Sequence, residues 1–511
     1  MDIMKVPVFV LTSNNKSQSN VLLIVFVVIS VLLLSILSGI LSAFANLYHL
    51  IALLALYGLF FVLTAPTTWV VWIIFWATFL ITGPTAYFFN LTQLQWLNVL
   101  MSAALLLPVL IHLLRIKANI LSTSISNDFF FPATFLLLIT FSTVIDHPQL
   151  TDFVNASRHY LFMWPLMLVF MLGLIRPEVV VQLWKALMIV AILQLPMALY
   201  QYFFVARKSA RLSPWDAVIG TFNGKIEGGG ESAGMAIMLL IAMLTAIALW
   251  RGGRLRSAWM SLVVITGLGT LALAEVKAAV MLLPVVIGLY YRKELIQRPI
   301  ESIVVMIGGV LLVVGIFTAY EVVHYGDAPT HSFNNKRVTS TYDRVMRALD
   351  PEEESAGGNQ LGRINHLINW WDINVIGGDL QHSLFGYGMG ATHASRINVG
   401  ELAARFHYPV NTTSTSILLW ETGILGHLVF LLILLSAAWT SERISNNEAI
   451  PDIHRIFLRI GAVSLMLLAL TLPYKNFHLY SNPIQFLMMF MLGQVAYWSR
   501  FVKNNLESMK L

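Results

Sequence analysis

Apolar residues in this chain form long continuous runs, with little of the alternation that marks strands. The runs recur from Val21 almost to the C-terminus. Each is at least about 18 residues long, enough for a helix to cross a hydrocarbon core of about 30 Å. Runs without period-two alternation exclude a transmembrane β-barrel. The pattern predicts an all-α polytopic membrane protein with about 12 to 14 transmembrane helices.

The expected spans follow from the limits of these runs. They are residues 21–43, 46–64, 67–88, 96–115, 130–146, 159–175, 180–204, 231–250, 257–274, 277–291, 300–319, 413–438, 455–473 and 483–499. The run at 21–43 is longer than the apolar core of a signal peptide, so we expect it to be retained as the first helix. The ranges 67–88 and 277–291 are the weakest of the set.

One long polar stretch, Val322–Thr413, interrupts the apolar pattern. It divides the chain into spans one to eleven (1–319), a large external loop (320–412), and spans twelve to fourteen with a cytoplasmic tail (413–511). Inside the loop, apolar residues recur at helical spacing over residues 361–376. We therefore expect an amphipathic helix there that lies on the membrane surface or caps the bundle.

Composition and charge fix the expected orientation. The chain is 57% hydrophobic and 11% charged, with a net charge of +6 and no cysteine. If the N-terminus is cytoplasmic, nearly every short basic connection falls on the cytoplasmic side, as the positive-inside rule requires. Both termini then lie inside and the large loop lies outside. The net charge is explained by topology, so nucleic acid is not an expected partner, and cysteine-based chemistry is excluded.

Two cations depart from this rule. Arg211 and Lys277 fall in connections predicted to lie outside, where positive charge weakens the topological signal. Arg363 lies in the external loop. Together the three side chains are suited to holding a diphosphate, because arginine offers a planar fork and lysine a point charge. The alternative is ordinary scatter, or pairing with lipid phosphates.

Histidines are the candidate proton acceptors. The second half of the loop holds His366, His382, His393 and His407. A neutral imidazole near pH 7 is a suitable general base for a sugar hydroxyl. For any one of them, packing in a loop is the more ordinary interpretation. No pair has the tight spacing of a zinc site, so no metal or other cofactor is expected.

Three further features have mainly structural interpretations. Glu421 falls in the span after the loop, where a buried acid must pair, face a cavity or lie near the surface. We favour a structural role in which it bonds to neighbouring groups. The glycines of Gly386–Gly390 predict a tight turn and not a nucleotide-binding loop, and Gly228–Gly230 predicts a flexible connection before the next helix.

Four stretches in this order resemble the bacterial O-antigen ligase/polymerase superfamily. RLSPWDAVIGTFNG (211–224) resembles the family's arginine loop that runs into "GtF", and LAEVKAA (273–279) stands where the family usually has "SRga". SLFGYGMGATH (383–393) is similar to its "hPllGyGxg" element. NTTSTSILLWETGILG (411–426) is similar to its re-entry helix, "HNxyLxxlxExGxxG". These matches cover about sixty residues, and the last two are the more specific.

The resemblance implies metal-independent glycosyl transfer at the periplasmic face of the bacterial inner membrane. The donor would be a glycan on undecaprenyl diphosphate, and basic residues would hold the diphosphate. A polymerase adds the glycan to another lipid-linked repeat unit, whereas a ligase adds it to lipid A–core. Membrane lipids and a chain-length regulator are further expected partners. We expect a polymerase, with the ligase as the alternative.

Transferred onto this sequence, the resemblance makes Arg211 the first diphosphate-binding residue and Lys277, which replaces an arginine, the second. The family's histidine would fall near Asn411, where this chain has Asn-Thr. His407 is the nearest histidine, so we expect it to be the base, with His393 and His366 as alternates. Asn411 and Glu421 are expected to support the site.

A secondary transporter or lipid flippase is the alternative from another functional class. About fourteen helices are compatible with it. Transporters of that kind carry inverted repeats and ionisable groups near the midplane. The sequence contains no recognisable internal repeat, and most of its charge falls outside the apolar runs. Glycosyl transfer is therefore the preferred prediction.

Overall fold

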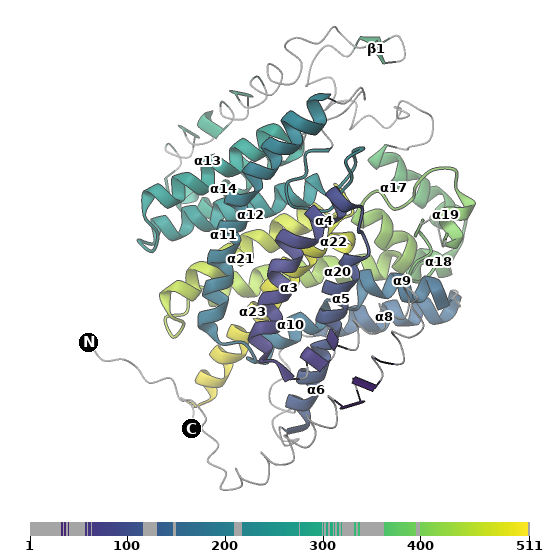
Figure 1. Ribbon diagram of the computed structural model, residues 1–511, viewed down its shortest axis with the longest axis horizontal. Coiled ribbons are helices and arrows are strands. Elements are labelled where there is room, and N and C mark those ends of the chain that lie inside the picture. Colours follow the sequence, from purple (N-terminus) through teal and green to yellow (C-terminus); the bar gives the residue numbers. More distant parts are fainter. Residues whose placement is uncertain are drawn as a thin grey trace. The chain divides into compact units, whose positions relative to one another are not determined.

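The computed structural model describes two units of the chain, Met1–Pro66 and Thr67–Leu511. The described residues are 64–115, 130–146, 150–208, 217–274, 276–298, 362–394 and 399–508, with scattered positions in 32–62 and 300–337. The predicted spans 21–43, 46–64 and 300–319 therefore lie mostly outside the described residues. The account below concerns the second unit (Figure 1).

Helices make up most of this unit. Before the large loop they are α3 (Thr67–Trp76), η1 (Ala77–Ile81), α4 (Thr82–Phe89), α5 (Leu94–Ala104), α6 (Leu106–Arg115), α8 (Phe130–Asp146), α9 (Leu150–Tyr160), α10 (Trp164–Met171), α11 (Pro177–Tyr200), η4 (Gln201–Val205), η5 (Ala206–Lys208), α12 (Ser232–Arg251), α13 (Ser257–Leu273) and α14 (Lys277–Gln297). The prediction of a helical fold is confirmed.

The described part of the loop and the chain after it also contain helices. These elements are α17 (Arg363–Trp371), η7 (Asp372–Ile376), α18 (Leu380–Phe385), α19 (Glu401–Arg405), α20 (Ser414–Ile444), α21 (Asp452–Leu470), α22 (Phe477–Tyr480) and α23 (Asn482–Ser508). Among the described residues, the only strands are β1 (Ser332–Phe333) and β2 (Lys336–Arg337), which pair antiparallel with Ser332 opposite Arg337.

Six helical stretches of the described chain are long and apolar enough to cross a membrane. They are Thr67–Phe89, Leu94–Arg115, Pro177–Lys208, Ser232–Arg251, Ser414–Ile444 and Asp452–Leu470. Two shorter apolar helices, Phe130–Asp146 and Ser257–Leu273, accompany them. This supports a multi-pass membrane protein. Both of the weakest predicted ranges, 67–88 and 277–291, are helical.

The span expected at 159–175 has a different form. The chain forms α9, then a turn at residues 161–163, and then the short helix α10. Pro165 stands in the first turn of α10. Proline lacks the N–H that would continue a preceding helix but fits well where a helix begins, so it favours a break there. As a result, α9 is a separate helix that carries Asp152, Arg158 and His159.

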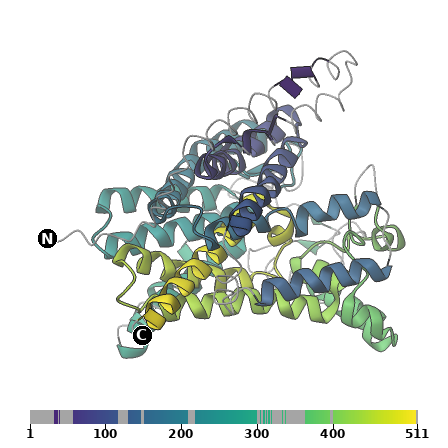
Figure 2. The ribbon, with the colours of Figure 1, turned by 90° about the horizontal axis from the view of Figure 1, so that it is seen from below.

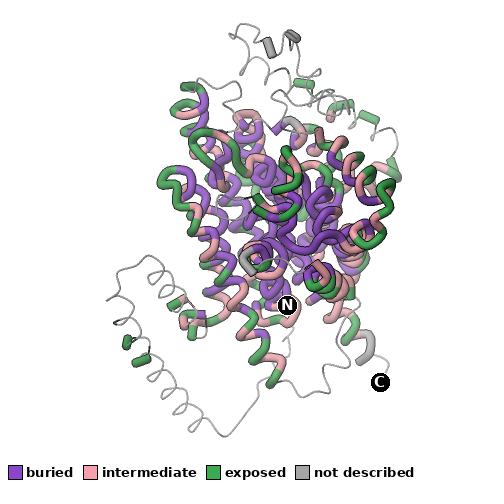
Figure 3. Tube along the Cα trace, turned by 90° about the vertical axis from the view of Figure 1, so that its right-hand side faces the viewer, coloured by how far each residue is buried: buried purple, intermediate pink, exposed green. Residues whose placement is uncertain are grey.

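The core lies where α12 meets its neighbours. This helix is apolar on every side, and nearly all of its residues are buried, as expected for a helix surrounded by other helices. It packs against α11, α13, α14, α21 and α23. Elsewhere in the core, α20 packs along α21 and α8, and α23 packs along α10. Figure 3 shows the buried residues concentrated in the middle of these helices.

The helices of the large loop pack against the rest of the unit. Figures 1 and 2 both show α17, α18 and α19 beside α8 and α9, and contacts join α18 to α8 and to α20. The predicted helix near 361–376 is present as α17 and η7. Its inward face carries His366, Trp370 and Asn374, while the apolar side chains of Ile368 and Trp371 are exposed. The apolar stripe therefore faces away from the protein, as a helix at a membrane surface requires.

Connections far apart in the sequence meet at one end of the bundle. The Lys475 carbonyl accepts a 3.2 Å hydrogen bond from the Ser414 backbone N–H at the start of α20. The Asn482 amide donates to the Gln95 carbonyl (3.3 Å), and the Ser481 hydroxyl donates to the Glu231 carboxylate. The starts of α5, α12, α20 and α23 thus lie together. We refer to this region as the loop end of the bundle.

Candidate functional site

The glycine-rich element of the loop packs against a break in α20. Gly386 has a φ of +74° and Gly423, at the break, has a φ of +66°. A Cβ on Gly386 would collide with the Thr422 backbone, and one on Gly423 would collide with the Leu384 backbone. Only glycine allows both the left-handed conformation and this close approach. The predicted tight turn is present, and its function is to dock the loop onto α20.

Glu421 fixes the next part of the loop. Its side chain is 1% exposed, and its Oε1 accepts hydrogen bonds from the Thr392 backbone N–H (3.0 Å) and hydroxyl (2.5 Å). The Tyr160 hydroxyl interacts with the same carboxylate. The Ser142 hydroxyl donates to the Glu421 carbonyl (3.0 Å). These contacts favour the structural interpretation of Glu421, because its acceptor capacity is used to join the loop to α20.

The segment that resembles "GtF" is anchored by buried amides of α11 and η4. The Gln201 side chain accepts from the Ile219 and Gly220 backbone N–H groups (2.9 and 2.8 Å), and Gln194 accepts from the Thr221 N–H (2.7 Å). The Thr221 hydroxyl also donates to the Phe79 carbonyl (2.6 Å). Buried backbone N–H groups need hydrogen-bond partners, and here the side chains of Gln194 and Gln201 supply them. The anchoring fixes the path of the chain toward Glu231.

Arg158, on α9, is a half-buried cation at the loop end. Its guanidinium carbon lies 5.0 Å from the Trp96 ring centroid, and Nη2 lies 3.5 Å from His159 Nε2. Its Nε is buried without a hydrogen-bond partner in the described part of the chain. No described carboxylate forms an ion pair with it. Burial lowers the pKa of Arg158, and a desolvated cation without a counter-charge is energetically costly.

Glu231 is an acid whose charge interacts with that of Arg158. It immediately precedes α12, and its carboxylate accepts from the Ser481 hydroxyl and the Asn223 amide (3.4 Å). Burial raises the pKa of Glu231 to about 7, while the hydrogen bonds from Ser481 and Asn223 and the charge of Arg158 lower it. The two charges interact electrostatically without forming an ion pair.

An aromatic and histidine cluster adjoins Arg158. The Tyr480 ring lies 4.1 Å from His159 and 6.4 Å from His393, centroid to centroid. His159 and His393 are themselves 6.1 Å apart. Burial, followed by the charge of Arg158, lowers the pKa of His393, while Asp152 raises it. His393 is therefore neutral over a wider range than a free histidine. These rings come from the loop, α9 and α22.

The four histidines expected from sequence occupy four different settings. His407 is exposed, in the bend between α19 and α20. His366 is 1% exposed, and neither ring nitrogen has a hydrogen-bond partner among the described residues; burial lowers its pKa to about 4. Of the three candidates, only His393 lies next to the buried cation. His382 bridges Asp379 (2.6 Å) and Asp146 (3.2 Å), so it holds α18 to α8.

The cations expected from sequence are placed only in part. Arg211 lies outside the described residues, and Lys277 begins α14, where its side chain is not described. The Arg363 guanidinium lies 4.5 Å from the Tyr474 ring centroid. Lys475 is solvent-accessible beside it, and desolvation, followed by the charge of Arg363, lowers the Lys475 pKa. The predicted convergence of Arg211, Lys277 and Arg363 therefore stays a prediction.

Asn411, expected to support the site, lies at the same end of the bundle. Its carbonyl accepts a 2.9 Å hydrogen bond from the Asn476 amide. Its side chain interacts with the Tyr480 hydroxyl and lowers the Tyr480 pKa, and the Tyr480 ring lies against both histidines of the cluster. Asn411 thus connects the end of the loop to the segment that contains α22. This placement matches a supporting role.

Three residues at the loop end were missed by the sequence analysis. Arg158 and Lys475 both fall in connections that the predicted orientation places outside, so the rule that singled out Arg211 also applies to them. Glu231 is the first residue of a predicted span and follows three glycines. An acid at a helix N-terminus has the ordinary explanation of interacting with the helix dipole, so only its buried contacts distinguish it.

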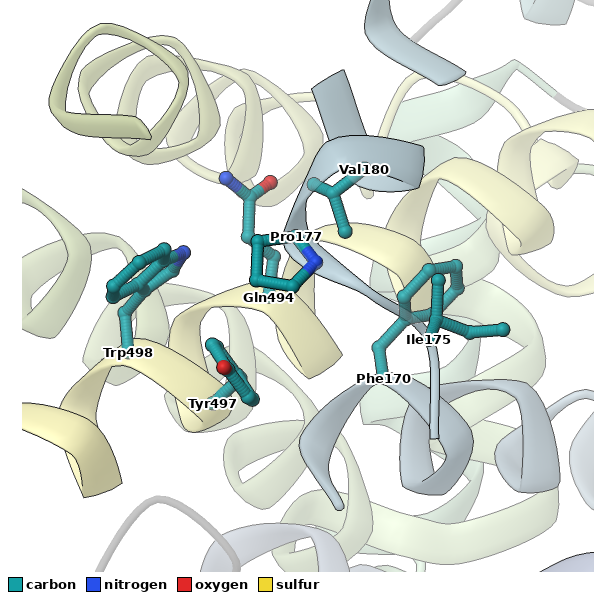
Figure 4. Close-up of a pocket in the computed structure, with 7 residues that line it drawn as sticks. All are labelled: Phe170, Ile175, Pro177, Val180, Gln494, Tyr497 and Trp498. Atoms are coloured by element: carbon teal, nitrogen blue, oxygen red, sulfur yellow. The ribbon is translucent and has the colours of Figure 1, made fainter. Parts of the chain in front are cut away.

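Two small cavities of the described structure are lined by neither Arg158 nor Glu231. Figure 4 shows one between α11 and α23, lined by Pro177, Gln494 and Trp498 among others, with a volume of about 10 Å³. A second, of the same volume, lies beneath His159 and Tyr160. Each has room for about one water molecule, which is far too small for a sugar. Among the described residues, no group of three or more His, Asp or Glu side chains is arranged to hold a metal.

Comparisons with known proteins do not assign this chain to a family. No family model matches the sequence, and no curated protein matches it.

Proposed function

We propose that the chain is a polysaccharide polymerase. It transfers an undecaprenyl-diphosphate-linked glycan to the hydroxyl of another lipid-linked repeat unit. In this proposal the protein is an inner-membrane protein with both termini cytoplasmic and the large loop periplasmic. The loop end of the bundle is the active site, and no metal takes part.

One observation carries the proposal: Arg158 is a half-buried cation whose Nε is buried without a hydrogen-bond partner, and it forms no ion pair in the described chain. Arg158 interacts electrostatically with His393, which belongs to the stretch that resembles "hPllGyGxg". It also interacts with Glu231, which follows the segment that resembles "GtF". A diphosphate between these groups would supply the missing charge. Guanidinium groups bind phosphate oxygens in pairs and stabilise the charge that develops as a diphosphate leaves.

Several residues have definite parts in this reaction. Arg158 holds the departing diphosphate, with Arg211 and Lys277 as the further cations that the resemblance supplies. Tyr480 offers a ring against which a sugar face can stack. Glu421, Thr392, Gly386 and Gly423 keep the loop docked so that these groups stay in place.

The direct test uses the purified protein in lipid nanodiscs with a lipid-diphosphate-linked repeat unit. A polymerase lengthens the glycan and releases undecaprenyl diphosphate without an ion gradient and in the presence of a chelator. Transfer only when lipid A–core is added would make it a ligase. Movement of the lipid-linked substrate across a sealed bilayer, without new glycosidic bonds, would overturn the proposal in favour of a flippase.

A further inference from the structure

Glu231 is held in place more firmly than a residue after three glycines would suggest. Gly224 and Gly230 form an antiparallel bridge, and the Lys225 N–H donates to the Gly229 carbonyl (3.2 Å). Gly228 and Gly229 have φ angles of +100° and +82°. The expected flexible connection is instead a tight hairpin. The Glu231 N–H then donates to the Asn223 carbonyl (2.8 Å), which fixes the carboxylate relative to the hairpin.

The groups around the carboxylate come from three separate parts of the chain. Ser481, between α22 and α23, and Asn223 donate hydrogen bonds to it. Arg158 on α9 is the cation whose charge lowers the pKa of Glu231. Tyr480, His159 and His393 lie around Arg158 in turn. No ion pair joins Glu231 to a cation in the described chain.

We propose that Glu231 accepts the proton of the acceptor hydroxyl in the glycosyl transfer described above. This inference rests on the proposed function, and it gives to a carboxylate the role that the resemblance gives to a loop histidine. The acceptor hydroxyl lies between Glu231 and the diphosphate held by Arg158.

The reaction balances with these groups alone. The acceptor oxygen forms a bond to the anomeric carbon as its proton passes to Glu231. The bond from the anomeric carbon to the phosphate oxygen breaks, and its electron pair leaves on undecaprenyl diphosphate. The proton is later released from Glu231 to solvent. No oxidant, reductant or metal is required.

Charge balance around Arg158 favours Glu231 over His393 as the base. When a carboxylate takes the proton, negative charge is lost at Glu231 while it grows on the diphosphate. Arg158 therefore keeps a counter-charge throughout the transfer. When His393 takes the proton, a second cation forms beside Arg158, whose charge opposes it. The raised pKa of Glu231, about 7, also matches a base that works near neutral pH.

The test compares Glu231→Gln with Glu227→Gln, an exposed acid of the same connection. Glutamine has the shape of glutamate and still accepts from Ser481, so thermal stability and donor binding are expected to persist. The kcat for transfer should fall by about 10²- to 10⁴-fold, the usual contribution of a general base. The control variant should transfer at the wild-type rate. His393→Gln and His407→Gln should each retain far more activity than Glu231→Gln.

The pH profile adds a readout that a structural role would not change. The base is active when deprotonated, so wild-type kcat/KM should rise with pH and level off above about pH 7. Residual activity of Glu231→Gln should lack this rise. If that variant does not fold, Glu231→Asp must shift the midpoint of the profile. If the wild-type protein transfers glycan and Glu231→Gln keeps the wild-type rate and pH profile, this inference is wrong and the proposed function stands. A wild-type protein that transfers nothing overturns the proposed function as well.

Discussion

The Glu421 side chain on α20 and Thr392 in the large loop are joined by two hydrogen bonds to one oxygen. The Thr392 N–H and hydroxyl both donate to Oε1, at 3.0 and 2.5 Å. Glu421 is also the residue whose carbonyl accepts from Ser142 on α8 (3.0 Å). One residue of a candidate transmembrane helix thus connects α20, α8 and the loop. The large loop is docked through a buried polar contact.

Glu421→Ala should destabilise the protein by about 2–4 kcal/mol, because two buried Thr392 donors lose their acceptor and a cavity forms. Glu421→Gln keeps an acceptor oxygen and should lose less. Unfolding followed by tryptophan fluorescence measures both, with the exposed Glu448→Ala as the unchanged control. A Glu421→Ala protein of normal stability but without transfer activity would contradict the structural role and indicate a chemical one.

Gly423→Ala should prevent the loop from docking. Gly423 and Gly253 both have a φ of +66°, a backbone conformation that alanine rarely adopts. At Gly423 the added methyl also collides with the Leu384 backbone, whereas nothing lies within 4 Å of it at Gly253. Limited proteolysis should therefore cleave the loop of Gly423→Ala much faster than that of Gly253→Ala. Equal cleavage rates would show that the close approach is unimportant.

The sequence predicted the helices well because membrane spans are encoded locally. Continuous apolar runs placed α8, α12 and α13 within one residue at each end, since each span must be apolar over a fixed length. The break between α9 and α10 depended on Pro165, whose effect a hydropathy pattern conceals because the flanking residues are apolar.

The candidate site was harder to predict because its members meet only through tertiary packing. Arg158 and Glu231 are far apart in the sequence, and neither belongs to a short motif. Their interaction depends on the hairpin before α12 and on the contact of Ser481 with Glu231. Histidine was the expected base from residue chemistry alone. Desolvation, which gives Glu231 a pKa of about 7, is visible only in the folded structure.

Arg158 should be required for donor binding and for release of the diphosphate. Arg158→Gln removes the charge, and we expect transfer to fall by about 10²- to 10³-fold, the scale of losing one electrostatic contact to a transition state. Arg158→Lys keeps the charge but not the planar fork, so an intermediate loss is expected. Lys225→Gln, at an exposed cation within the hairpin that precedes Glu231, is the control. Normal transfer by Arg158→Gln would exclude it from the diphosphate site.

The absence of cysteine from the chain allows a direct test of the proposed orientation. Glu401→Cys places a single thiol at the start of α19 in the large loop, and Ser257→Cys places one at the start of α13, after the connection that follows α12. Both positions are exposed.

Because Glu401 lies in the proposed periplasmic loop, a membrane-impermeant thiol reagent applied to spheroplasts should label Glu401→Cys. Ser257→Cys should be labelled only after the membrane is permeabilised, because α12 separates it from the loop end. This helix runs from the loop end, next to Glu231, to Arg251. Its 20 residues span about 30 Å, the thickness of the hydrocarbon core. Labelling in the reverse pattern would place the loop end in the cytoplasm, where a periplasmic polymerase cannot act.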